Sequence, residues 1–293
     1  MTGYNWTADD IVYHHKPEEY GAIHFHDDDI DDARWEVDFT FDVPDIIKSG
    51  IYAARLRING EDSPETEDFV PFVIKPPKGK TTSKLAFIVP TNSYMAYSND
   101  NLGTNSVVAQ LLAGKVPVMS ASDLYLNEHR EYGLSTYSLH SDGSGVCYSS
   151  RLRPILNMRP KYRHWLSPSL WQLNGDLHLT DWLEEKGLDF DVLTDEDLHI
   201  EGVDLLNRYQ CVLTGSHPEY SSEKMIAAYE AYQLQGGRWI YLGADGFYWI
   251  SEYHPDNLNI IEVRKGEAGT RAWTANPGEY NNAFDGKFGG MWR

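Results

Sequence analysis

Along the first 80 residues, apolar side chains alternate with polar ones. The alternation predicts strands over residues 33–44, 49–58 and 68–77, because successive side chains of a strand point to opposite faces. Short strands separated by polar turns favour a β-sandwich of the Ig-like type, and we expect it to form a first domain over residues 1–80. The first predicted strand places Trp35, Val37, Phe39 and Phe41 on one face, and the second run closes in an Asn59-Gly60 turn.

A different pattern begins after a linker of proline, glycine and lysine at residues 75–84. Short, continuous apolar runs alternate there with helical periodicity, which is typical of strands buried on both faces of a parallel sheet. We therefore expect an α/β domain with a doubly wound sheet over residues 81–293. Thr180 and Gly187 are the predicted caps of its first clear helix. Strands are predicted over 84–90, 188–194, 210–216 and 238–242, and helical segments over 179–187, 195–209 and 221–237.

Composition narrows the classes of function. Apolar residues make up 41% of the 293 positions, which indicates a globular protein, and no apolar run approaches the roughly 20 residues of a membrane span. The net charge of −19 argues against nucleic acid and anionic membranes as partners. Only two cysteines occur, Cys147 and Cys211, and the first residues resemble no signal peptide, so a cytoplasmic location is expected.

Polar clusters follow three of the predicted parallel strands. Because the carboxyl ends of such strands share one rim of the sheet, Tyr97, His217, Glu219 and Asp245 are expected to converge there. The same residue types also form ordinary turns, so each cluster taken alone has a purely structural explanation.

The polar residues at this rim could serve either as a nucleophile or as metal ligands. A nucleophile at Ser216 or Cys211 is weakly supported, because the turn after the strand is not a G-x-S-x-G elbow. Oxygen ligands from tyrosines and carboxylates favour a hard cation, and phenolate suits ferric iron in particular. A second candidate lies early in the chain, where His24 and His26 precede a run of aspartates. This segment either binds a divalent ion or is a strand edge that runs into a solvated acidic turn.

Several segments resemble a known family, the large (beta) subunit of N,N-dimethylformamidase. They are "KPPKGKTTSKLAFIVPTNSYMAYSND", "TDWLEEKGLDFDVLTDEDLH", "GSHPEYSSEKM" and "LGADGFYW". The resemblance implies a class I amidotransferase-like α/β core with a mononuclear Fe³⁺ held by two tyrosines and a glutamate. Family members are much longer, so the chain looks like a fragment or a truncated relative whose catalytic domain is incomplete at the C-terminus.

The resemblance also implies roles for particular residues. The metal ligands would be Tyr97, Glu219 and, as the second tyrosine, Tyr137, with Tyr148 as the alternative. The catalytic residues would be His217, Asp245, which stands where many relatives carry asparagine, and Lys265.

The implied function is iron-dependent hydrolysis of small N-substituted formamides. N,N-dimethylformamide would give dimethylamine and formate by attack of metal-activated water. The implied partners are a small amide substrate and a homo-oligomer of large subunits with a small accessory subunit. The alternative is a non-catalytic β-sandwich plus α/β module that serves assembly or carbohydrate binding.

Overall fold

A four-stranded parallel sheet forms the centre of the protein. The computed structural model describes residues 2–10, 15–21, 26–58, 66–101, 111, 114, 116–166 and 170–292. The strand order is β5-β3-β6-β8, with Ala86 paired to both Asp191 and Val212. All four strands were predicted from continuous apolar runs, and the structure confirms them. Their bounds are β3 (Leu85–Val89), β5 (Asp191–Thr194), β6 (Cys211–Thr214) and β8 (Arg238–Ile240).

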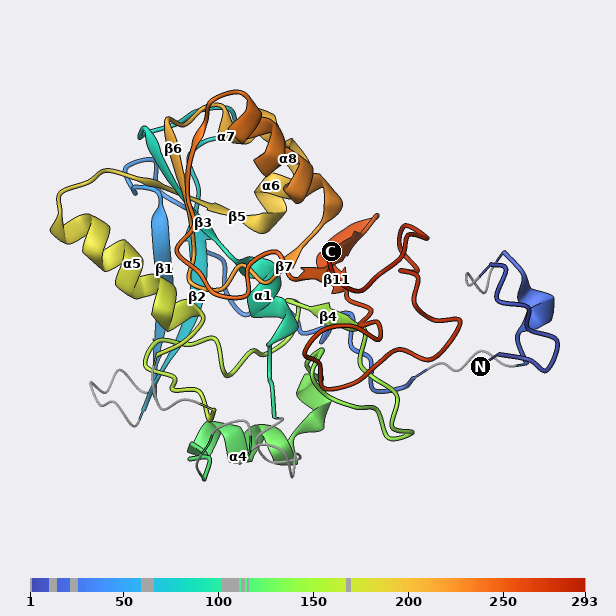
Figure 1. Cartoon of the computed structure of the whole chain (residues 1–293). Helices are drawn as coiled ribbons and strands as arrows, with labels where there is room; N and C mark the ends of the chain where they lie inside the picture. Colours follow the sequence, from blue (N-terminus) through green and yellow to red (C-terminus); the bar gives the residue numbers. More distant parts are fainter. Residues whose placement is uncertain are drawn as a thin grey trace.

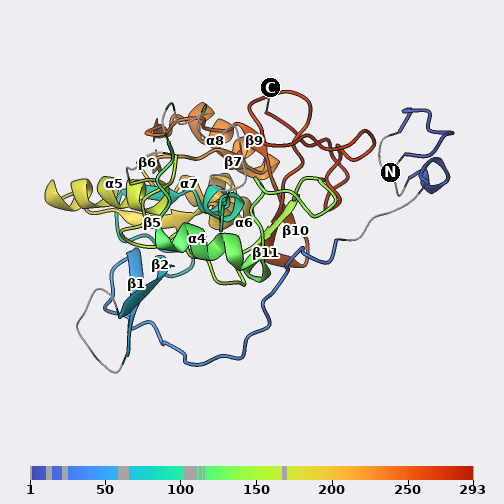
Figure 2. The ribbon, with the colours of Figure 1, turned by 90° about the horizontal axis from the view of Figure 1, so that it is seen from below.

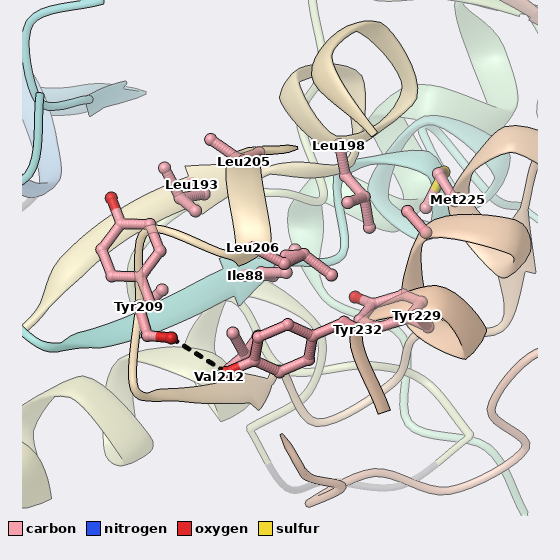
Figure 3. Close-up of a cluster of buried hydrophobic side chains, with 12 residues drawn as sticks. Ile88, Leu193, Leu198, Leu205, Leu206, Tyr209, Val212, Met225, Tyr229 and Tyr232 are labelled. Atoms are coloured by element: carbon pink, nitrogen blue, oxygen red, sulfur yellow. Dashed lines mark hydrogen bonds between the residues drawn. The ribbon is translucent and has the colours of Figure 1, made fainter. Parts of the chain in front are cut away.

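Three helices cover one face of this sheet: α6 (Asp195–Glu201), α7 (Val203–Leu206) and α8 (Glu223–Leu234) (Figure 1). They bury an apolar core against β3 and β6, in which the Tyr232 hydroxyl donates a hydrogen bond of 3.1 Å to the Tyr209 carbonyl oxygen (Figure 3). Gly202, with φ of 60°, separates α6 from α7. The buried members shown in Figure 3 include Ile88, Leu193, Leu198, Leu205, Leu206, Val212 and Met225.

The other face is covered by α5 (Leu173–Glu185) and by an antiparallel hairpin, β1 (Gly50–Arg57) and β2 (Glu67–Ile74). Leu183 of α5 and Ile51 and Val73 of the hairpin pack into one core with Phe87 and Val192 of the sheet. Figure 2 shows the hairpin projecting from the α/β body. Helices on both sides of a parallel sheet confirm a mixed α/β fold.

Two of the three strands predicted in the first 80 residues are confirmed, as β1 and β2, and the third is not. In the described residues of this stretch, the hairpin is the only pair of strands, and residues 33–44 form no strand. Trp35 remains 68% exposed and Phe39 62% exposed. Alternation makes a segment amphipathic, but a strand also needs a ladder of backbone hydrogen bonds to a neighbour. Among the described residues, only the Ala33 N–H of this segment bonds to a distant backbone group, the Leu152 carbonyl oxygen at 2.7 Å. The predicted Asn59-Gly60 turn lies outside the described residues.

One predicted helix boundary was wrong. The helix begins at Leu173 rather than after Thr180, whose hydroxyl donates to the Leu177 carbonyl oxygen (3.1 Å) inside α5. Gly187 follows the helix with φ of 65°, as predicted for a residue that ends a helix.

Smaller elements surround the centre. β4 (Tyr148–Ser150), β10 (Glu252–His254) and β11 (Asn257–Glu262) form an antiparallel sheet in the order β10-β11-β4, and β7 (Tyr220–Ser221) pairs in parallel with β9 (Trp249–Ile250). The helices α1 (Thr91–Ala96) and α4 (Ala121–Glu128) and the 3-10 turns η1 (Pro17–Glu19) and η3 (Arg130–Tyr132) complete the described elements. Each helix in the described part of the chain is too short or too polar to span a membrane.

Asp195, the first residue of α6, makes the stability of the fold depend on pH. Its carboxylate accepts the backbone N–H of Asn92 at 2.9 Å, yet burial raises its pKa to about 8. An unfolded aspartate ionises near 3.8, so folded Asp195 keeps its proton over a range in which the unfolded chain has lost it. This group therefore contributes stability at acid pH that is lost as the pH rises towards 8, by up to about 1.4 kcal/mol per pH unit.

We predict that Asp195→Asn, which mimics the protonated acid, removes this loss. The difference in free energy of unfolding between variant and wild type should grow from pH 5 to pH 8 and then level off. Urea unfolding across that range measures the difference, and Asp181→Asn, at an exposed position of α5, is the control. A difference that does not change with pH would contradict the prediction.

Candidate metal centre

The short helix α1 organises the candidate site. β3 leads through Pro90 into α1, and Tyr97 stands at the C-terminal end of this helix. The Tyr97 N–H donates to the Ser93 carbonyl oxygen at 3.0 Å, and its own carbonyl oxygen accepts the Asn157 side chain at 2.7 Å. The Tyr97 backbone is thereby fixed on both sides, at the carboxyl rim of the sheet.

The turn after β6 brings Glu219 to the same place. A Cβ on Gly215 would lie 2.5 Å from Cδ of Pro90, so only glycine allows the two turns to approach this closely. Further along, the Glu219 N–H donates to the Ser93 hydroxyl at 3.0 Å. The turn is also held from α5, because Asp176 accepts the Ser216 N–H at 2.5 Å. Burial raises the pKa of Asp176 to about 6, although its hydrogen bonds act in the opposite direction.

A third segment supplies Tyr137. The Thr136 N–H donates to the Ala96 carbonyl oxygen at 3.0 Å, at the end of α1, and the Tyr137 N–H donates to the Ser135 hydroxyl at 3.1 Å. Segments from residues 97, 137 and 219 are therefore all anchored on one short helix.

The three side chains converge on one another. The Tyr97 hydroxyl donates to Oε2 of Glu219 at 2.7 Å, and the Tyr137 hydroxyl lies 3.3 Å from Oε1 of the same carboxylate. Tyr137 also donates to the Tyr97 hydroxyl, and its own oxygen accepts the hydroxyl of Tyr220 at 2.7 Å. Glu219 is 5% exposed, whereas the rings of Tyr97 and Tyr137 are half-buried. Burial first, and then the charge of Glu219, raises the pKa of all three phenols well above its ordinary value.

His217 adjoins this cluster in a defined orientation. Its Nδ1 accepts the indole N–H of Trp171 at 3.2 Å, and its Nε2 lies 3.1 Å from Oε2 of Glu219. The Nε2 atom is buried without a well-formed hydrogen bond among the described residues. Because indole can only donate, the proton of neutral His217 must sit on Nε2, which faces the carboxylate.

Lys265, which follows β11, provides a buried positive charge. Its Nζ lies 3.5 Å from the centre of the Tyr137 ring and donates to the Thr136 carbonyl oxygen at 2.9 Å. Burial lowers the pKa of Lys265 to about 7, and the negative charge of Glu219 opposes that shift. The Lys265 ammonium group therefore lies over the face of the Tyr137 ring.

The donor set fits a hard cation. Two phenol oxygens and one carboxylate lie within hydrogen-bonding distance of one another, and hard oxygen donors of this kind suit ferric iron. The fully buried Tyr220 and the Nε2 atom of His217 border the same oxygens.

The sequence also matches known proteins. The model of the family "N,N-dimethylformamidase beta subunit-like, C-terminal" matches residues 1–293. The chain belongs to this family. It is 46% identical over its whole length to proteins named N,N-dimethylformamidase beta subunit from Paracoccus aminophilus and from an Alcaligenes species. It spans 38% of the length of each of these relatives.

Not every residue suggested by the dimethylformamidase resemblance joins the cluster. Tyr148, the alternative to Tyr137, lies on β4, where its hydroxyl accepts a hydrogen bond of 3.0 Å from Arg264. Asp245 is exposed in the loop after β8, with a positive φ of 48°, and its catalytic role stays a prediction. Ser216 Oγ is buried and has no hydrogen-bond partner within the described ranges, and burial raises the pKa of the Cys211 thiol. Neither residue has the activating base of a nucleophile.

Two side chains of the site were not predicted. Tyr220 directly follows Glu219 and begins the short strand β7. The sequence has no motif that predicts the contact of its hydroxyl with Tyr137. Trp171 lies far from the other site residues in sequence and belongs to no motif, so only the fold reveals its bond to His217.

We predict that neutral His217 carries its proton on Nε2 in the metal-free protein. Long-range proton–nitrogen correlation NMR distinguishes the two tautomers. Trp171→Phe should increase the population protonated on Nδ1, because it removes the donor to that atom. Trp165→Phe is the matched control, since its indole donates instead to Asp100 at 3.0 Å. A proton on Nδ1 in the wild type would show that the assignment is wrong.

Proposed function

We propose that the chain carries the metal centre of an iron-dependent amidohydrolase that acts on small N-substituted formamides such as N,N-dimethylformamide. The observation that carries the proposal is the convergence of Tyr97, Tyr137 and Glu219, residues that are 122 positions apart at their extremes, within hydrogen-bonding distance. Membership of the dimethylformamidase beta-subunit family and 46% identity to two proteins of that name support the substrate class.

Tyr97, Tyr137 and Glu219 would hold a mononuclear Fe³⁺. When bound, the ion supplies a Lewis acid that polarises an amide carbonyl and acidifies water. A buried carboxylate among three neutral phenols is poorly compensated, and a cation would favour the ionised form of the phenols that ligate it.

His217 and Lys265 supply the remaining chemistry. Amide cleavage leaves an amine that needs a proton, and His217 holds one on Nε2 at the edge of the cluster, oriented by Trp171. Lys265 lies on the Tyr137 ring, where its positive charge would stabilise negative charge that develops on the carbonyl oxygen. Trp249 belongs to the same apolar cluster as Tyr97 and Tyr137, whereas Phe247 packs instead against Tyr229 and Trp239.

The wider assembly is part of the same proposal. The parallel sheet would be an amidotransferase-like core whose rim carries a metal centre in place of a nucleophile, and the hairpin of β1 and β2 would belong to a β-sandwich. The relatives are named as beta subunits. We propose by analogy that the chain works in an oligomer of large subunits with a small accessory subunit.

We predict that the purified chain binds one ferric ion with a visible tyrosinate charge-transfer band. Tyr97→Phe, Tyr137→Phe and Glu219→Gln should each reduce the iron content or remove the band, because each deletes one oxygen ligand. Elemental analysis and the visible spectrum measure this, and release of formate from dimethylformamide measures turnover. Tyr148→Phe is the control, since it removes a hydrogen-bonded phenol outside the cluster.

Colourless, metal-free wild type, or variants that keep full iron and colour, would refute the metal centre. Iron-loaded chain that releases no formate would refute the reaction for this chain while leaving the centre intact.

We also predict that Lys265→Met lowers the rate of formate release by about 100-fold without loss of iron. A preorganised group that stabilises developing charge contributes an effect of this order. Lys161→Met is the matched control, because Lys161 also lies over an aromatic ring, that of Phe69 at 5.4 Å. Its side chain is exposed and forms an ion pair with Glu67, which is not part of the cluster. Turnover equal to that of wild type would exclude Lys265 from the reaction.

A further inference from the structure

A second group of potential metal ligands lies outside the tyrosine and glutamate cluster. It consists of His26, Asp29 and His140, whose ligand atoms all lie within 4.8 Å of one another. Nδ1 of His26 is 3.9 Å from Oδ2 of Asp29, and Nε2 of His140 is 3.6 Å from Oδ1 of Asp29. Ligand atoms around a tetrahedral zinc ion are about 3.3 Å apart. The rings of His26 and His140 lie nearly parallel, so one of them would rotate out of this stack to share an ion with the other.

The nitrogen atoms that do not face Asp29 already have partners. Nδ1 of His140 lies 2.5 Å from a carboxylate oxygen of Asp28, and Nε2 of His26 lies 2.8 Å from the hydroxyl of Ser144. Metal-binding histidines typically engage their second nitrogen in this way, which fixes the tautomer and the direction of the ring. The arrangement therefore orients one nitrogen of each ring towards the third ligand.

Charge and burial point to a cation. Oδ1 of Asp29 is buried and makes no hydrogen bond within the described part of the chain. Asp28 and Asp142 add two carboxylates around the histidines, whereas Arg130 approaches Asp28 only to 3.9 Å. The rings of His26 and His140 stack with their centres 3.7 Å apart.

We propose that His26, Asp29 and His140 form a second site that binds a divalent transition metal ion such as Zn²⁺. Two imidazole nitrogens and one carboxylate suit such ions. His140 is 1% exposed at its side chain and His26 is 21% exposed, so the site is open on one side to water as a further ligand. His24, the other histidine of the early sequence motif, lies outside the described residues.

The site would join two distant parts of the chain. His26 and Asp29 lie in the segment before β1, whereas His140 lies in the loop of residues 135–146, which also carries Tyr137. This loop is closed by bonds such as that from the His140 N–H to the Ser144 carbonyl oxygen at 2.9 Å. A metal on His140 would therefore stabilise the loop that positions one of the proposed iron ligands.

Zinc binding to the untagged, metal-free chain tests the proposal. We expect one Zn²⁺ per chain in competition with a chromophoric chelator, with Asp29→Asn and His140→Gln each weakening the affinity at least 100-fold. His129→Gln is the matched control, because His129 is a histidine 2.6 Å from a carboxylate oxygen of Glu131 that lies outside the group. The Asp29→Asn variant should keep the melting temperature of the metal-free wild type, since Oδ1 loses no hydrogen bond.

The same measurement in a Tyr97→Phe/Glu219→Gln background separates this site from the proposed iron centre. One zinc should still bind there, and zinc should slow amide hydrogen exchange in residues 138–146 only when Asp29 is present. The proposal is overturned if wild type binds no zinc at 100-fold excess, if Asp29→Asn binds it as tightly as wild type, or if binding disappears with Tyr97 and Glu219.

Discussion

The hydrogen bond from the Glu219 N–H to the Ser93 hydroxyl is the contact on which the rest of the site depends. It joins the turn after β6 to the helix after β3, and so places a carboxylate from one strand end beside a phenol from the other. Ser93 is fully buried, and its carbonyl oxygen also accepts the Tyr97 N–H. One residue of α1 thus sets the backbone of both ligands. The close approach requires Gly215, whose place no side chain can take without displacing Pro90.

The electrostatic design follows from this placement. Glu219 is almost fully buried, and its neighbours are His217 and phenols that burial keeps protonated. Lys265 is a further buried basic group near it, whose pKa the charge of Glu219 raises. That ammonium is itself desolvated and contacts the Tyr137 ring rather than the carboxylate. Such an arrangement destabilises the folded state, because buried charges stabilise a fold only when they are well paired. It is consistent with the metal centre that we propose for this cluster.

The sequence predicted the parts of the fold that depend on local pattern. Continuous apolar runs located β3, β5, β6 and β8, and the rule that ligands gather at the carboxyl rim placed Tyr97, His217 and Glu219 together. Residues 33–44 show the limit of such patterns, because alternation specifies a face but not a hydrogen-bonding neighbour. Trp171 shows another limit. Its indole N–H decides the tautomer of His217, yet it comes from an irregular segment without periodicity or motif. The resemblance named both Tyr137 and Tyr148 as candidates for the second tyrosine, and only the folded structure shows that Tyr137 is the one beside Glu219.

The loop of residues 135–146 connects the two candidate sites and explains why an irregular segment can hold a ligand with precision. It has no helix or strand of its own, so its order must come from anchors at both ends. At one end Thr136 donates to the end of α1, and its carbonyl oxygen accepts both Lys265 and the indole of Trp273. At the other end, Gly145 packs so closely against Trp273 that a Cβ would lie 1.8 Å from the ring. Between these anchors the contacts of His140 with Asp28 and His26 tie the loop to the early acidic segment. Residues more than 100 positions away thus restrict the loop that carries Tyr137. A loss of order in the segment of His26 and Asp28 would therefore loosen the position of the Tyr137 hydroxyl oxygen.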